Sequence, residues 1–198
     1  MSTRNLIRNK ELPDVSQSSD FGTQYSYFNE DLDPHFPVPL IQELEISIFT
    51  DSDHGHDKIT GRSITGILVM VGSTPVIWES KRQSSVQLST YGAEFVALKR
   101  AVSVAEEIRY TLRSMGVRVT KATNIYEDNQ SVCISSTNPG TTLNKKNVAL
   151  AYHYVREHQA NGVVNIIKIP SEDNYADAFT KGFNSNIHGN HFHNLMIN

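Results

Sequence analysis

Four carboxylates in this 198-residue chain occur in surroundings where a solvated acid is unusual. Asp51 ends the apolar stretch "EISIFTD", and Asp128 follows the apolar stretch "NIYE". Glu94 lies four residues before Leu98, in line with the apolar stripe of a predicted helix, and Asp177 lies in "YADAF". Burying an unpaired carboxylate is costly, so such groups are usually paired, protonated or bound to a metal ion. Hard divalent ions such as Mg²⁺ prefer oxygen ligands, and phosphoryl chemistry often uses two of them.

Each acid also has an ordinary structural interpretation when it is taken alone. Asp51 can start a turn, and Asp177 can be an acid in the first turn of a helix. Asp128 can cap a helix, with Glu127 beside it complementing the helix dipole. The four acids indicate a metal site only if the fold brings them together. The arrangement of the helices and strands that carry them therefore decides between the two interpretations.

Apolar periodicity predicts a mixed α/β domain. Residues 44–53 alternate, with Leu44, Ile46 and Ile48 on one face and Phe49 and Asp51 on the other. Further strands are expected at 63–72, 74–81, 122–127 and 163–170. Helices are expected at 90–115, 128–136, 147–160 and 171–183. The order β-β-β-α-β-α-α-β-α implies a mixed five-stranded sheet flanked by helices.

The long helix is the clearest of these elements. Its apolar residues recur in steps of three and four, which is typical of one buried helix face: Leu98, Ala101, Ala105, Ile108, Leu112 and Met115. We expect Thr90 to cap this helix. Ser171 or Asp173 is expected to cap the last helix.

Composition sets wider limits on the chain. It is 38% hydrophobic and 20% charged, as in globular proteins, and its net charge of −3 indicates weak independent binding to a polyanion. Cys133 is the only cysteine, so no internal disulfide can form. No apolar run is long enough to span a bilayer, and we expect no membrane partner. Residues 1–42 are polar and rich in proline and are interpreted as an extension or tether, and residues 184–198 as a polar tail.

Five stretches of sequence resemble a known family in their order and wording. They are "FTDSDHGHDKITGRSITGILV", "WESKRQSSVQLSTYGAEFVALKRA", "IYEDNQSV", "YHYVRE" and "NYADAFTK". Together they make residues 43–183 similar to the ribonuclease H domain of copia-type long-terminal-repeat retrotransposon polyproteins. The resemblance implies a ribonuclease H-like fold and a metal-dependent endonuclease that hydrolyses the RNA strand of RNA–DNA hybrids.

The same resemblance implies a set of site residues and a cofactor. The cofactor is Mg²⁺, as two ions, with Mn²⁺ as a substitute. The implied catalytic metal ligands are Asp51, Glu94, Asp128 and Asp177. Asp53 is a supporting acid, and Glu127 is expected to point away from the site.

Substrate and partner expectations follow from the family and from side-chain chemistry. Asn129 and Gln130 can donate to sugar or backbone, and Lys81, Arg82, Lys145 and Lys146 can contact phosphates, although a solvated surface explains the lysines equally well. The expected partners are an RNA–DNA hybrid and a reverse transcriptase domain of the same polyprotein. The expected location is the cytoplasm, including the virus-like particles of the element.

Two other functions remain open from the sequence. One is a catalytically inactive retroelement-derived module that keeps the fold and binds nucleic acid or serves as a structural part. The other is a transposase or integrase of related fold. The spacing from Asp128 to Asp177 and the lack of a basic DNA-binding domain count against the second. The presence of all four acids favours an active nuclease.

Overall fold

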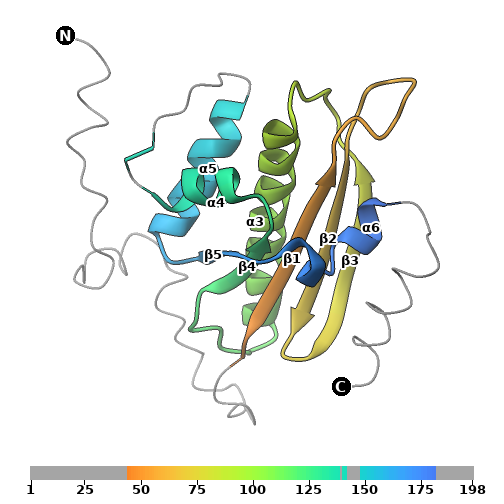
Figure 1. Cartoon of the computed structure of the whole chain (residues 1–198). Helices are drawn as coiled ribbons and strands as arrows, with labels where there is room; N and C mark the ends of the chain where they lie inside the picture. Colours follow the sequence, from red (N-terminus) through yellow and green to blue (C-terminus); the bar gives the residue numbers. More distant parts are fainter. Residues whose placement is uncertain (1–43, 139, 142–147, 182–198) are drawn as a thin grey trace.

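Five strands form one mixed sheet in the order β3-β2-β1-β4-β5 (Figure 1). The computed structural model describes residues 44–138, 140–141 and 148–181. Strands β1, β2 and β3 are antiparallel neighbours, and β4 and β5 run parallel to β1. The strands are β1 Ile46–Asp53, β2 Ile64–Val71, β3 Thr74–Arg82, β4 Thr123–Glu127 and β5 Val164–Lys168. The mixed five-stranded sheet predicted from the sequence is confirmed.

Helices lie on both faces of this sheet, so the domain has three layers (Figure 1). One face is covered by α3 (Thr90–Ser114), α4 (Gln130–Thr137) and α5 (Ala149–Ala160). The other face of β1, β2 and β3 carries the short α6 (Asp177–Thr180), which follows a 3₁₀ turn at Ser171–Asp173. The prediction of one helix over 171–183 was wrong for its described part, because Asn174 breaks the segment into two pieces.

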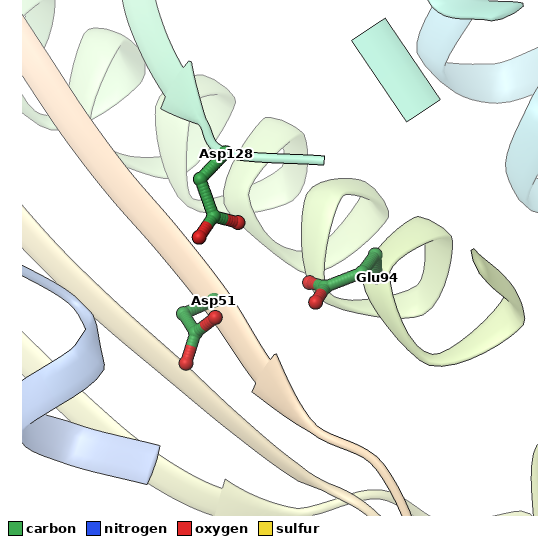
Figure 2. Close-up of side chains that lie close together, drawn as sticks. All are labelled: Asp51, Glu94 and Asp128. Atoms are coloured by element: carbon green, nitrogen blue, oxygen red, sulfur yellow. The ribbon is translucent and has the colours of Figure 1, made fainter. Parts of the chain in front are cut away.

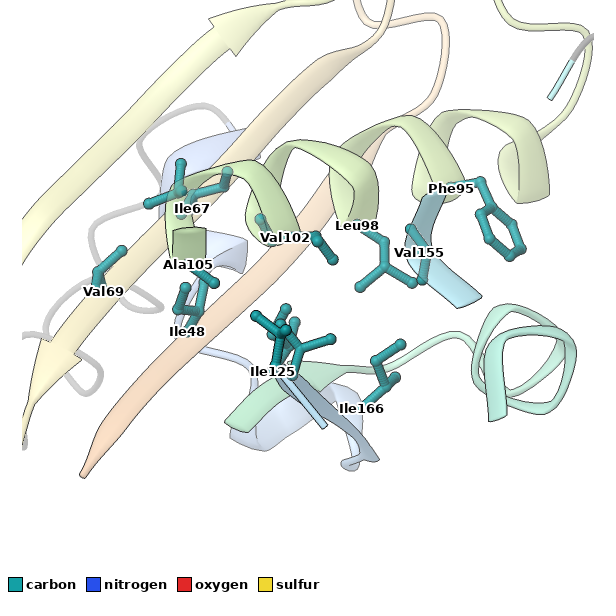
Figure 3. Packing of buried hydrophobic residues seen from close by; sticks show 14 of the residues in the cluster. Ile48, Ile67, Val69, Phe95, Leu98, Val102, Ala105, Ile125, Val155 and Ile166 are labelled. Carbon is teal, nitrogen blue, oxygen red and sulfur yellow. The ribbon is translucent and has the colours of Figure 1, made fainter. Parts of the chain in front are cut away.

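The hydrophobic core lies between α3 and the sheet (Figure 3). Ile48 of β1, Ile67 of β2 and Ile125 of β4 point towards Leu98 and Val102 of α3, and all five are fully buried. Burying a side chain of this size contributes about 1.5–3 kcal/mol. The core therefore fixes α3 against β1 and β4, the two strands that carry Asp51 and precede Asp128.

Three local expectations are corrected at helix ends and on α5. Ser89, not Thr90, caps α3: its side chain accepts a hydrogen bond from the Gly92 N–H, and Thr90 is the first helical residue. Met115, expected in the apolar stripe, is the C-cap and is 68% exposed. In the helix predicted over 147–160 we expect His153 to be a partly buried histidine rather than a catalytic one, but it is exposed on α5.

No helix in the described part of the chain has the length and apolar character needed to cross a membrane. Cys133 is buried in α4. The expectations for residues 1–42, residues 184–198, Lys145 and Lys146 lie outside the described residues.

Candidate metal centre

The site lies where β1 and β4 separate. Their parallel pairing ends at Phe49 and Tyr126, after which β1 continues beside β2 while the chain leaves β4 to enter α4. Asp51 and Asp128 each lie two residues beyond this last pair. Ligand sites in α/β sheets form at such openings beyond the carboxyl ends of parallel strands. The strand register thus brings these two acids to the same opening.

Glu94 reaches the opening from the helical layer. It lies on α3 and is buried, as is Asp51, whereas Asp128 is half-buried. Each of the three acids offers an oxygen atom, and these atoms lie within 4.8 Å of one another. Figure 2 shows the three side chains gathered around one space, from β1, α3 and the end of β4. Three of the four predicted acids therefore form one cluster.

Burial and mutual repulsion disfavour the charged forms of these acids. Burial, with smaller contributions from the charges of Asp177 and Asp128, raises the pKa of Asp51 to about 6, although a hydrogen bond from Thr180 opposes the rise. Burial first, and then the charges of Asp51 and Asp128, raise the pKa of Glu94 to about 9. A cation bound among these acids would stabilise their charged forms.

The donor set fits a divalent ion. Oε2 of Glu94 is buried and has no hydrogen-bond partner among the described residues. A buried carboxylate oxygen without a partner is costly, and an oxygen-seeking cation would satisfy it. Asp51, Glu94 and Asp128 are the residues that would hold such an ion.

Asp177 lies beside this cluster but is not one of the three acids. Its charge raises the pKa of Asp51, so it is close to that residue. Its Oδ2 accepts a hydrogen bond from Lys181, the residue that follows α6. The fourth predicted acid is thus brought to the site but is engaged by a cation of the chain itself.

Three residues that the sequence motifs did not single out hold α6 against the sheet. Asn174 is fully buried, and its Nδ2 donates to the carbonyl oxygen of Thr50, 2.9 Å away. Thr180 donates from its hydroxyl to Oδ2 of Asp51. Gly66, which pairs with Asp51, leaves room for α6, since a Cβ there would be 2.7 Å from the Ala176 carbonyl oxygen. The available signal was their place in the quoted motifs "NYADAFTK" and "RSITG".

Glu127 does not behave as the solvated bystander that we expected. It is fully buried at the end of β4, on the same face as Ile125. Its Oε1 accepts a hydrogen bond from the Asn129 N–H at 3.0 Å, and its Oε2 has no partner among the described residues. Burial, then the charge of Glu94, raises the pKa of Glu127 well above its ordinary value. Glu127 therefore lies behind the cluster, close to Glu94, and does not point away from it.

The two predicted polar substrate contacts differ in availability. Asn129 is the N-cap of α4, and its Oδ1 accepts from the N–H groups of Ser131 and Val132. Gln130 is the first residue of α4 and is exposed. Gln130 is thus the freer of the two side chains to meet a substrate.

The predicted basic contacts lie at the same end of the sheet as the acids. Asp53 pairs with Ile64, and Ile64 pairs with Arg82, which places Lys81 and Arg82 two strands from the end of β1. Arg82 donates to Asp57 at 2.9 Å, whereas Lys81 is exposed. Asp53 is not in the three-acid cluster, and its Oδ2 lies 2.6 Å from Nδ1 of His56.

Some known proteins are similar to this chain in sequence, and others are similar to it in fold. No family model matches the chain. It is 30% identical over 138 residues to the retrovirus-related Pol polyprotein from transposon RE1 of Arabidopsis thaliana, a match that covers 70% of the chain and 9% of that protein. It is also 30% identical over 133 residues to the Pol polyprotein from transposon TNT 1-94 of Nicotiana tabacum, covering 67% of the chain and 10% of that protein. The chain thus spans about a tenth of the length of these relatives.

Solved structures identify the fold. The compost-derived LC11-RNase H1 matches with a TM-score of 0.54 at 16% identity, over 68% of this chain and 91% of that one. The N-terminal RNase H domain of rv2228c from Mycobacterium tuberculosis matches with a TM-score of 0.54 at 14% identity, over 76% and 98%. A structure of LC11-RNase H1 in complex with an RNA/DNA hybrid also matches, with a TM-score of 0.54 at 16% identity over 68% and 93%.

Proposed function

We propose that this chain, which has the ribonuclease H fold and is homologous to a segment of retrotransposon Pol polyproteins, is a metal-dependent endonuclease of copia type. It hydrolyses the RNA strand of RNA–DNA hybrids during reverse transcription. The solved relative in complex with an RNA/DNA hybrid supports this substrate class by analogy.

The observation that carries the proposal is the convergence of three carboxylates on one opening of the sheet. Asp51, Glu94 and Asp128 come from three separate elements, yet their ligand oxygens lie within 4.8 Å of one another. Two of these acids are buried, and burial opposes their charge. A fold that only needed to be stable would not gather buried acids in this way.

The acids act together as ligands of the metal ions. When bound, two Mg²⁺ ions, or Mn²⁺ in their place, activate a water and stabilise the charge on the phosphate and the leaving oxygen. Asp51, Glu94 and Asp128 hold and orient the cations, and Asp177 is the fourth ligand. Asp51 and Glu94 are buried, and this burial would strengthen their electrostatic interactions with the cations.

Substrate contacts would extend from the acids along the same end of the sheet. Gln130 and Nδ2 of Asn129 face the 2′-hydroxyl and sugar edges that separate RNA from DNA. Lys81 and Arg82 contact phosphates two strands away. The low net charge of −3 makes phosphate binding by this chain alone weak. A reverse transcriptase domain of the same polyprotein would supply further grip, in the cytoplasm or in virus-like particles.

A labelled RNA–DNA hybrid tests this function directly. Wild-type protein with Mg²⁺ or Mn²⁺ is expected to cut the RNA strand of the hybrid and to leave duplex DNA and single-stranded RNA intact. Glu94→Gln, which keeps the shape but removes the charge, should abolish cleavage. A wild-type protein that binds the hybrid without cutting it, with either metal, would support the inactive module instead.

A further inference from the structure

At the end of α6, two consecutive residues donate hydrogen bonds to two acids. The Thr180 hydroxyl donates to Oδ2 of Asp51, and the next residue, Lys181, donates from Nζ to Oδ2 of Asp177. Asp51 is a candidate metal ligand of the three-acid cluster, and Asp177 is the acid beside it. One short segment thus sets the position of both carboxylates.

The Lys181 ammonium interacts with three of the acids, Asp177, Asp51 and Asp128. Its Nζ makes an ion pair with Oδ2 of Asp177, and the charges of Asp51 and Asp128 also attract it. The ammonium therefore already does, for Asp177 and in part for Asp51, what a metal cation would do.

The ion pair is asymmetric in its exposure. The side chain of Asp177 is 12% exposed, whereas that of Lys181 is 55% exposed. The lysine can therefore swing into solvent on its flexible stem while the carboxylate stays in place. Oδ1 of Asp177 is buried and has no hydrogen-bond partner among the described residues, so one oxygen is taken and the other remains open.

We propose that Lys181 is a tethered counter-cation that occupies Asp177 in the metal-free protein and competes with the divalent ion for this carboxylate. This inference rests on the proposed function, because it concerns the metal affinity of the same site. Lys181 is a positioning residue that keeps the acids together before metal arrives. Metal can engage Asp177 fully only after the ammonium leaves it.

This role predicts that loss of the Lys181 ammonium lowers the stability of the metal-free protein and raises its affinity for metal. Removing the ammonium leaves a mostly buried carboxylate unpaired, so the metal-free protein should unfold at a lower temperature. The same change removes a competitor, so the metal dissociation constant should fall, by roughly two- to tenfold for an ion pair that is half-exposed. If Lys181 had only a structural role, its removal would lower the stability and the metal affinity together.

The experiment is a calorimetric titration of Mn²⁺ into the whole chain at one neutral pH and one ionic strength. Lys181→Met and Lys181→Gln should both bind Mn²⁺ more tightly than wild type and melt at a lower temperature in chelator. Lys181→Arg, which keeps the charge, should bind Mn²⁺ no more tightly than wild type. Lys99→Met is the matched control, since Lys99 lies exposed on α3 over the Tyr154 ring and its loss removes the same charge.

Two results would overturn the inference. One is a dissociation constant in Lys181→Met that is unchanged or higher than that of wild type. The other is an equal gain in affinity for Lys99→Met, which would reduce the effect to net charge. Failure of the proposed function gives a different result: wild type would then take up no Mn²⁺, or Asp51→Asn would take up as much as wild type.

Discussion

Phe49 and Tyr126 are the last residues paired between β1 and β4, and their rings stack with centroids 4.8 Å apart. Beyond this pair the two strands separate, and the acids Asp51 and Asp128 follow at the same offset. The core under Ile48 and Ile125 fixes the register, because a slip by one residue would turn every side chain to the opposite face. The site is therefore a consequence of strand register.

Removal of either charge at this opening should stop cleavage. Asp51→Asn and Asp128→Asn should each reduce hydrolysis of an RNA–DNA hybrid by roughly two orders of magnitude or more, because an amide binds Mg²⁺ poorly. Circular dichroism should show an intact fold in both variants. Asp173→Asn is the control, since Asp173 lies exposed on the 3₁₀ turn before α6. Near-normal cleavage by either of the first two variants would exclude that acid as a ligand.

Glu127 gives a prediction about stability. Its raised folded-state pKa means that the folded protein keeps a proton that the unfolded chain has lost. Stability therefore falls as pH rises from the ordinary glutamate value towards the folded one. Glu127→Gln keeps an acceptor for the Asn129 N–H and removes this loss, so it should raise the free energy of unfolding by about 1–3 kcal/mol at neutral pH.

The measurement for Glu127 is urea unfolding at several pH values in chelator. The gain in Glu127→Gln should shrink towards acidic pH, where the wild-type carboxyl is protonated in both states. Glu127→Ala, which also loses the acceptor for Asn129, should be less stable than Glu127→Gln at every pH. A gain that does not change with pH would show that Glu127 is not a buried, proton-holding group.

The sequence predicted the elements and three converging acids because those signals are local. The alternation of Ile46 and Ile48 identified β1, and the step of four from Leu98 placed Glu94 on the buried face of α3. The burial of Glu127 was also available from the strand period, because it lies two residues after Ile125. Our expectation that Glu127 points away from the site gave its charge more weight than its position in the strand.

The seating of α6 could not be read from local pattern. Thr180 and Asp51 are 129 residues apart in the chain, and Asn174 and Thr50 are 124 apart. Hydrophobic periodicity along the sequence does not predict contacts between residues that are so far apart in the chain. The final helix was expected to extend over 171–183, but Asn174 turns its side chain to the Thr50 carbonyl and to the Ala176 N–H. The competing bonds of an asparagine side chain explain the break.

Metal binding and pH should both change the free energy of unfolding through the acids of the cluster. The pKa values of Asp51 and Glu94 rise from 3.8 to about 6 and from 4.5 to about 9. Both folded values exceed the unfolded ones, so the metal-free protein should lose stability as pH rises between about 4 and 9. Millimolar Mg²⁺ should raise the melting temperature most at the upper end of this range, by mass action.

A charge-removing variant separates this cluster from unrelated acids. Asp128→Asn removes a charge that raises the pKa of both Asp51 and Glu94, so in chelator it should melt about 2–5 °C above wild type. It should also respond less to Mg²⁺. Thermal melts at one ionic strength, with Asp173→Asn beside them, measure both effects. A lower melting temperature for Asp128→Asn in chelator, with no response of wild type to Mg²⁺, would mean that the acids do not repel one another.

Gly66 tests whether α6 must lie close to the sheet. A Cβ at this position would come within 2.7 Å of both the Ala176 carbonyl oxygen and Cγ2 of Thr180. The carbonyl belongs to the backbone and cannot turn aside, so Gly66→Ala should push α6 outwards. We expect a loss of about 1–3 kcal/mol in the free energy of unfolding. Hybrid cleavage should fall as well, because Thr180 then no longer reaches Asp51.

Gly92→Ala is the matched control for this substitution. A Cβ at Gly92 would lie 3.2 Å from Oε1 of Gln87, which is the end of a flexible side chain and can move. Alanine also favours the helical conformation over glycine in α3. Gly92→Ala should therefore cost less stability than Gly66→Ala in urea unfolding. If Gly66→Ala unfolds at the wild-type urea concentration and cleaves hybrid at the wild-type rate, close contact of α6 with β2 is not what positions Asp51 and Asp177.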